Sequence, residues 1–137
     1  MINANASIRA HDVYTILVMD DDEMVRELAD ITLKRLGYKV VCCPDGATAV
    51  SLYRLAWEKG EPFSLVIMDL TIPGGMGGIE AAGKIHAFAP EAQLVVSSGY
   101  SDDPVMANFS DFGFCAALEK PYNVEEINSI LQMTTQR

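Results

Sequence analysis

The sequence has little positive charge, few cysteines and no long apolar run. Its 137 residues carry 10 Lys and Arg against 19 Asp and Glu, which gives a formal net charge of −9. Nucleic acids and anionic membranes attract clustered positive charge, so this balance argues against direct contact with either. The longest apolar run, residues 114–118, is far shorter than the roughly 20 residues that span a bilayer. The composition therefore indicates one globular domain that contacts neither membranes nor nucleic acids.

The 3 cysteines do not form the pattern of a disulfide framework. Cys42 and Cys43 are adjacent, and with Cys115 they all lie in short apolar runs. This arrangement indicates buried thiols in a reducing cytoplasm. Residues 1–12 contain no apolar block of the kind found in a secretory signal. We expect them to form a flexible tail before a domain at 13–137.

Five short apolar runs predict the strands of a sheet. Each is too short for a helix, and each is continuous rather than alternating, as in strands buried on both faces of a parallel sheet. The runs are residues 16–19, 40–43, 65–68, 94–96 and 114–118.

The stretches between these runs have helical spacing. We expect helices around residues 25–36, 47–59 and 79–88, a fourth that opens at Asp103-Pro104 and a fifth that begins at Asn123. Strands that alternate with helices predict an α/β fold, a parallel sheet with helices on both faces. In such sheets the ligand lies beyond the carboxyl ends of the strands.

Polar residues follow most of the predicted strands at that edge. Residues 20–23 are all acidic and follow the first strand, Asp69 follows the third, Ser97 and Ser98 end the fourth, and Lys120 closely follows the fifth. Each has an ordinary explanation, because acids often open helices and single polar residues often form turns. Their joint occurrence predicts one crevice that contains all of them.

These residue types suit phosphoryl transfer. Carboxylates from two neighbouring strands repel each other unless a cation lies between them, and an all-oxygen set with room for water favours Mg²⁺. A lysine ammonium and the metal can neutralise phosphoryl oxygens while Asp69 attacks in line and becomes an aspartyl phosphate.

Four segments carry a resemblance to a known family, namely residues 16–23, 65–74, 96–100 and 118–122. The sequence resembles the receiver domains of bacterial two-component response regulators, most of all those attached to hybrid sensor histidine kinases. The resemblance covers about residues 14–133. It implies a flavodoxin-like, doubly wound sheet of five parallel strands in the order 2-1-3-4-5, with five helices in a three-layer α/β/α arrangement.

The resemblance also implies a role for each site residue. Asp69 is expected to be the phosphoacceptor, with Lys120 binding the phosphoryl group and Ser98 supplying the switch hydroxyl. Asp20, Asp21, Asp69 and the backbone carbonyl of Thr71 are expected to bind Mg²⁺, for which Mn²⁺ can substitute. Asp22 is expected to open the first helix instead, the bond from Lys120 to Pro121 is expected to be cis, and no other cofactor is implied.

The implied function is that of a phosphorelay receiver in the cytoplasm. A sensor histidine kinase or a histidine phosphotransfer protein would donate the phosphoryl group, docking near the first helix and Pro121-Tyr122. The receiver would catalyse its own phosphorylation and dephosphorylation without being a classified enzyme. We expect a monomer or weak dimer, either stand-alone or part of a hybrid histidine kinase, with no further domain after residue 137.

Two alternatives and two departures from the family pattern accompany this interpretation. The alternatives are a binding module that is never phosphorylated and a Mg²⁺-dependent phosphohydrolase; against the latter, Thr71 stands where such enzymes usually carry a second Asp.

Ala117 replaces the aromatic residue that often reads out phosphorylation, and Tyr100 is a candidate substitute. The loop at residues 74–78 looks one residue longer than usual. We interpret it as a flexible connection needing positive φ; the other interpretation is a mobile loop shaped for one kinase.

Overall fold

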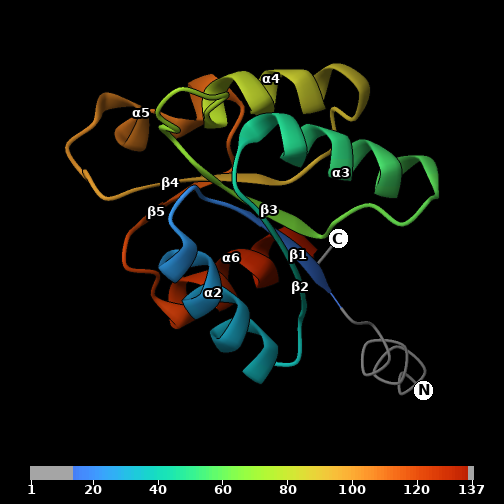
Figure 1. The fold of residues 1–137 in the computed structure, drawn as a ribbon, viewed down its shortest axis with the longest axis horizontal. Coiled ribbons are helices and arrows are strands. Elements are labelled where there is room, and N and C mark those ends of the chain that lie inside the picture. Colours follow the sequence, from blue (N-terminus) through green and yellow to red (C-terminus); the bar gives the residue numbers. More distant parts are fainter. Residues whose placement is uncertain (1–13, 136–137) are drawn as a thin grey trace.

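The computed structural model describes residues 14–135, and the expected tail at 1–12 lies outside them. Five strands form one parallel sheet in the order β2-β1-β3-β4-β5, which confirms the predicted doubly wound fold (Figure 1). The strands are β1 (Thr15–Met19), β2 (Lys39–Cys43), β3 (Leu65–Asp69), β4 (Leu94–Ser98) and β5 (Ala116–Glu119).

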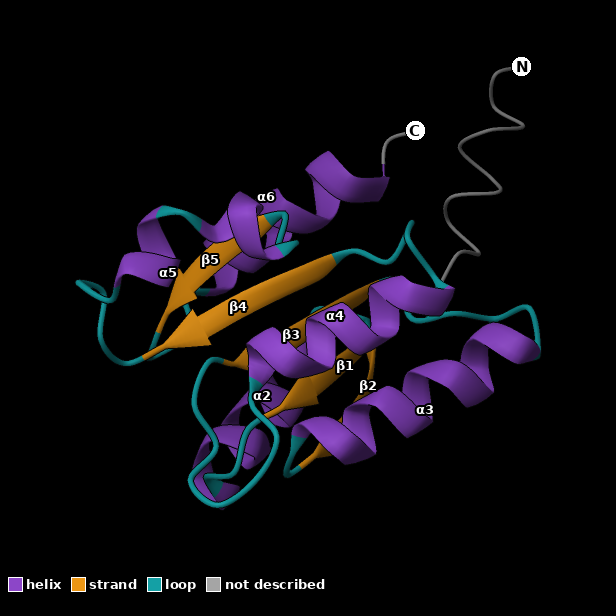
Figure 2. Cartoon of the chain, turned by 90° about the horizontal axis from the view of Figure 1, so that it is seen from above, coloured by secondary structure: helices purple, strands orange, loops and turns teal. Residues whose placement is uncertain are grey.

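Helices cover both faces of this sheet, as Figures 1 and 2 show. On one face lie α2 (Glu23–Arg35) and α6 (Val124–Thr135), and on the other lie α3 (Gly46–Glu58), α4 (Gly78–Phe88) and the short α5 (Pro104–Ala107). A 3₁₀ turn, η1 (Phe109–Phe112), follows α5 and precedes β5 in the chain. The three-layer α/β/α arrangement is therefore confirmed.

Successive side chains of each buried strand point to opposite faces of the sheet, and they contribute to one hydrophobic core on each face. In β1, Leu17 and Met19 pack on the side of α3 and α4, whereas Ile16 and Val18 pack on the side of α2 and α6. All four side chains are fully buried. This explains why the predicted strands are continuously apolar rather than alternating.

Short polar side chains begin several of the helices. Asp22 caps α2 by accepting hydrogen bonds from the backbone N–H groups of Met24 and Val25, which confirms that it opens the helix. Asn123 does the same at the start of α6, where it accepts from the N–H groups of Glu125 and Glu126. The caps thus set where the chain turns from each strand's carboxyl end into the following helix.

Candidate functional site

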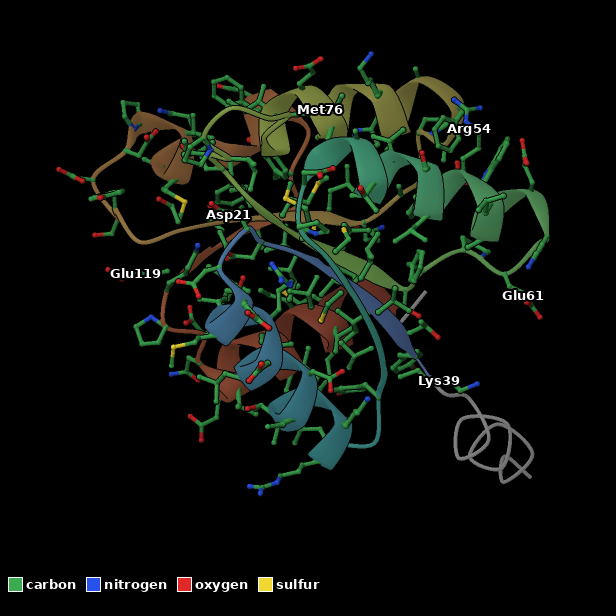
Figure 3. All side chains as sticks on the ribbon, viewed as in Figure 1. Asp21, Lys39, Arg54, Glu61, Met76 and Glu119 are labelled. Atoms are coloured by element: carbon green, nitrogen blue, oxygen red, sulfur yellow. The ribbon has the colours of Figure 1, made fainter. Side chains whose placement is uncertain are left out.

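The predicted site residues gather at the carboxyl edge of the sheet. Asp20 directly follows β1, Asp69 ends β3, Ser98 ends β4 and Lys120 directly follows β5. Figure 3 shows Asp21 and Glu119 towards this end of the sheet, with Lys39 at the opposite end. The site residues expected from the sequence therefore converge where parallel strands of this order bring their ends together.

Three carboxylates lie close enough to share one cation. One oxygen each from Asp20, Asp21 and Asp69 lies within 4.8 Å of the others. Asp20 is fully buried and Asp69 is 6% exposed, while Asp21 is open to solvent. Burial, and then the charge of Asp20, raises the pKa of Asp69 above the usual range of an aspartate. The ionised form of Asp69 is therefore disfavoured in this cluster unless a cation compensates for its charge.

Lys120 partly neutralises this charge. Its Nζ lies 2.7 Å from Asp20 Oδ2 and 3.1 Å from Asp69 Oδ2, so one ammonium bridges two strands. Burial alone would lower the pKa of Lys120, but its bond to Asp20 and the charges of Asp69 and Asp20 outweigh burial and raise it. The side chain consequently stays charged at neutral pH. The bond from Lys120 to Pro121 is cis, as expected.

The donor set fits a hard divalent cation. Asp20 Oδ1 accepts the N–H of Asp22 at 2.9 Å, which orients the carboxylate. The buried Oδ2 of Asp20 has no partner besides the Lys120 ammonium among residues 14–135. Asp69 Oδ1 accepts the N–H of Thr71 at 3.4 Å, which brings the backbone of that residue beside the carboxylates. Oxygen donors with one solvent-facing side match the preference of Mg²⁺, which keeps part of its water shell.

We expect Mg²⁺ to stabilise the folded chain through these carboxylates. At about 100 times its Kd, a ligand that binds only the folded state adds about 2.7 kcal/mol to the free energy of unfolding. Thermal denaturation in Mg²⁺ and in EDTA measures this as a rise in Tm. The rise should shrink in Asp21→Asn and persist in Asp22→Asn, because asparagine caps a helix as well as aspartate does. An equal rise in both variants would contradict this placement of the metal.

Ser98 is buried at the same edge, but its hydroxyl is engaged elsewhere. Ser98 Oγ accepts the backbone N–H of Tyr100 at 3.0 Å and lies 3.5 Å from the carbonyl of the same residue. The side chain of Tyr100 is 76% exposed, so it is not packed in the position that an inward-turned aromatic would occupy. Ala117 is only partly buried and packs against the core beside α3 and α4. The Ser98 hydroxyl is thus hydrogen-bonded to the backbone of the turn that follows β4.

The glycine-rich loop before α4 is fixed by close backbone approaches. Only Gly74 of this run has positive φ, at +75°. A Cβ on Gly77 would lie 2.6 Å from the carbonyl oxygen of Leu70, so no larger residue fits there. The carbonyl of Met76 accepts the N–H of Gly46 at 2.8 Å, which ties the loop to the start of α3. The expectation of positive φ is therefore confirmed at one position, and close packing explains Gly77.

The structure adds one site residue, Arg26, that the sequence analysis did not single out, and it pairs Ser97 with Tyr122, which the sequence did not predict. Arg26 donates from its guanidinium to the backbone carbonyl of Asp20 at 2.8 Å, and so holds the turn between β1 and α2. Ser97 and Tyr122 form a hydrogen bond behind the carboxylates, with 3.3 Å between their hydroxyl oxygens. A signal for Arg26 was its spacing, since it is the fourth residue of the helix that follows Asp20 and so lies about one turn from the start of that helix. Ser97 was visible as a polar residue directly after the apolar run at residues 94–96.

Comparison with known proteins identifies the family. The family model of the response regulator receiver domain matches residues 16–132. A cyclic di-GMP phosphodiesterase of Thermotoga maritima is 31% identical over 111 residues, which are 81% of this chain and 28% of that protein. The autoinducer 1 sensor kinase/phosphatase LuxN of Vibrio campbellii is 27% identical over 85% of this chain and 13% of that protein. The chain thus spans less than a third of the length of either relative.

A solved structure has the same fold. The CheX-CheY-BeF₃-Mg²⁺ complex from Borrelia burgdorferi contains a chain that matches with a TM-score of 0.79 and 18% identity, over 92% of each chain. At this identity the likeness concerns the fold alone. Among residues 14–135, no helix has both the length and the apolar character needed to cross a bilayer.

Proposed function

The chain belongs to the response regulator receiver domain family of two-component signalling, and we propose that it accepts a phosphoryl group on Asp69. The observation that carries this proposal is the clustering of Asp20, Asp21 and Asp69 with the Lys120 ammonium across two of them. Carboxylates held this close leave one nucleophilic oxygen beside a metal site and a cation. Asp20, Asp21, Asp69 and the carbonyl of Thr71 would hold Mg²⁺, or Mn²⁺ in its place.

The proposed chemical step is an in-line displacement. A carboxylate oxygen of Asp69 attacks the phosphorus of a phosphohistidine, the new O–P bond forms, and the P–N bond breaks with its electron pair going to the imidazole. Mg²⁺ would neutralise charge on the transferring oxygens. Lys120 would turn from the carboxylate of Asp69 to a phosphoryl oxygen and keep its contact with Asp20. The domain thus supplies the catalytic groups for its own modification.

The proposed switch uses Ser98. Once Asp69 carries a phosphoryl group, the Ser98 hydroxyl would donate to it and release its two contacts with the backbone of Tyr100. The turn after β4 would then rearrange, which changes the surface near α5 and β5 that partners read. Ala117 offers no aromatic side chain to this rearrangement, so exposed Tyr100 is the candidate readout.

The proposed donor docks beside α2. An apolar hollow of about 270 Å³ lies between α2 and the segment after β5, where Leu28, Pro121 and Tyr122 are among the lining residues. Leu28 is 59% exposed on this surface. Lys120 lines the same hollow, which would bring a docked donor's phosphohistidine next to the site. A sensor histidine kinase or a histidine phosphotransfer protein with an apolar helix face would fit.

The setting of the domain is also a proposal. We propose a cytoplasmic receiver at residues 13–137, acting as part of a hybrid sensor histidine kinase or as a stand-alone regulator. The similarity to a sensor kinase/phosphatase supports the first. The net charge of −9 supports protein partners rather than nucleic acid or membrane, with the domain as a monomer or weak dimer.

Transfer from a phosphohistidine donor tests the proposed function. A radiolabelled histidine phosphotransfer domain, mixed with this chain and Mg²⁺, should lose its label to the chain. The product should be labile to hydroxylamine, as acyl phosphates are, and Asp69→Ala should block its formation. A label that stays on the donor, for every phosphotransfer domain tried and with acetyl phosphate as the alternative donor, would refute the proposal.

A further inference from the structure

Ser97 places a buried hydroxyl near the carboxyl end of β4, directly after three apolar strand residues. Its side chain is fully buried, and in the ladder between β3 and β4 it lies directly opposite Asp69. The backbone carbonyl of Ser97 also accepts the N–H of Leu70, the residue after Asp69, at 2.9 Å. Ser97 is therefore joined to the strand end that carries the proposed phosphoacceptor.

The hydroxyl of Ser97 is paired with Tyr122. The two oxygens lie 3.3 Å apart, and either hydroxyl can be the donor. A buried hydroxyl without a partner is costly, whereas two apolar side chains of similar shape would need no bond at all. The two buried hydroxyls therefore satisfy each other inside the fold.

Tyr122 belongs to the segment that carries Lys120. The N–H of Lys120 donates to the carbonyl of Ser98 at 2.9 Å, which fixes the segment where it leaves β5. Two residues further on, the Tyr122 ring packs against the core beside α2 and α6, and its hydroxyl reaches back to Ser97. Residues 120–122 are thus tied to β4 at two points, by the Lys120 N–H on the Ser98 carbonyl and by the Tyr122 hydroxyl on the Ser97 hydroxyl.

We propose that the Ser97–Tyr122 hydrogen bond is a positioning contact for Lys120 in phosphoryl transfer. The ammonium of Lys120 must contact Asp20 and Asp69 on different strands at 2.7 and 3.1 Å, so a small shift of its backbone breaks one contact. Tyr122 also lines the hollow beside α2, so a donor bound in that hollow would contact Tyr122 directly. The inference rests on the proposed function, because it assigns a role within that site.

Removal of single hydroxyl groups tests the inference. Tyr122→Phe, Ser97→Ala and the double variant are compared with the wild type for the rate of phosphorylation by acetyl phosphate in saturating Mg²⁺. Each single variant should react about fivefold more slowly, the effect expected of one net hydrogen bond, and the double variant should be no slower than the single ones. Tyr38→Phe is the matched control, because it removes a tyrosine hydroxyl that donates to Asn128 of α6 at 2.7 Å and takes no part in the proposed site. It should react at the wild-type rate.

Mg²⁺ affinity separates positioning from damage to the fold. Calorimetric titration of Mg²⁺ should give a dissociation constant in Tyr122→Phe that is unchanged or tighter, because Lys120 and the metal contact the same carboxylates. A merely structural defect would weaken Mg²⁺ binding together with the rate, and that result would overturn the inference. So would a wild-type rate in both single variants.

The wild-type reaction distinguishes this inference from the proposed function. If the wild-type chain takes up no phosphoryl group and binds no beryllofluoride, the proposed function fails and the inference fails with it. If the wild type reacts and Tyr122→Phe reacts equally fast, only the positioning role is overturned.

Discussion

Replacing Asp69 with asparagine should abolish phosphoryl uptake and stabilise the chain in EDTA. The amide cannot form an acyl phosphate, and it removes one of two buried charges that repel each other. Because burial and the charge of Asp20 outweigh Lys120 in raising the pKa of Asp69, ionisation of this carboxyl costs stability in the metal-free fold. We expect a gain of about 1 kcal/mol in the free energy of unfolding at pH 7.

The pH dependence of this gain follows from the sign of the shift. A carboxyl whose pKa is raised on folding destabilises the fold as pH rises through that pKa, and the effect disappears once both states are protonated. The advantage of Asp69→Asn should therefore shrink as pH falls from the raised pKa of Asp69 towards the usual pKa of an aspartate, and it should be absent below that usual pKa. Denaturant unfolding in EDTA at several pH values measures it, with exposed Asp111→Asn as the control. An Asp69→Asn chain that is less stable than the wild type at pH 7 would contradict this account.

Replacing Lys120 with methionine should have the largest effect on stability. It leaves Asp20, which is fully buried, and Asp69 without their shared cation. Removing one partner of a buried ion pair costs about 3 kcal/mol. Because the pKa of Lys120 is raised, the lost stabilisation is present throughout the neutral range and disappears only as pH rises through that alkaline pKa. Mg²⁺ should restore much of the loss, since it neutralises the same carboxylates.

The same variant should phosphorylate about 100-fold more slowly, because it loses the cation that meets the transferring oxygens. Lys34→Met is the matched control, since Lys34 pairs with Asp30 at 3.1 Å on the exposed surface of α2. That pair is open to solvent, so its loss should change stability by less than about 0.5 kcal/mol. Equal losses of stability and of phosphorylation rate in Lys120→Met and Lys34→Met would show that the ion pairs of Lys120 with Asp20 and Asp69 contribute no more than an exposed pair.

The fold was predictable because its strands are buried on both faces. Continuous apolar runs such as residues 65–68 can be recognised as strands without knowing which strands pair with them. Parallel pairing then brings Asp20, Asp69 and Lys120 to one edge of the sheet. The positions of the carboxylates thus follow from strand ends alone. Their individual distances do not, because these depend on side-chain rotamers.

The fourth helix predicted from the sequence, which is α5 in the structure, was only partly predictable. Asp103 caps it as expected, but the helix has four residues and ends at the C-cap residue Asn108. The side chain of Asn108 donates to the carbonyl of Pro104 at 2.9 Å, and the chain continues as a 3₁₀ turn up to Gly113 with φ of +89°. Local hydrogen bonding of this kind competes with helix propagation, and spacing of apolar residues does not reveal it.

The two adjacent serines show where sequence reasoning stops. Family spacing selects Ser98 for the switch and leaves Ser97 without a role. Successive side chains of a strand point to opposite faces, so the two hydroxyls meet different neighbours: Tyr100 for Ser98 and Tyr122 for Ser97. Tyr122 lies 25 residues away along the chain, and no local pattern connects such a pair.

Intact mass spectrometry after incubation with acetyl phosphate tests the central claim most directly. With Mg²⁺ present, the wild-type chain should gain one phosphoryl group, and borohydride trapping of the acyl phosphate should map it to Asp69. EDTA or Asp69→Ala should prevent the gain. A wild-type chain that gains no phosphoryl group and also binds no beryllofluoride in Mg²⁺ would contradict the account and favour a binding module that works without phosphorylation.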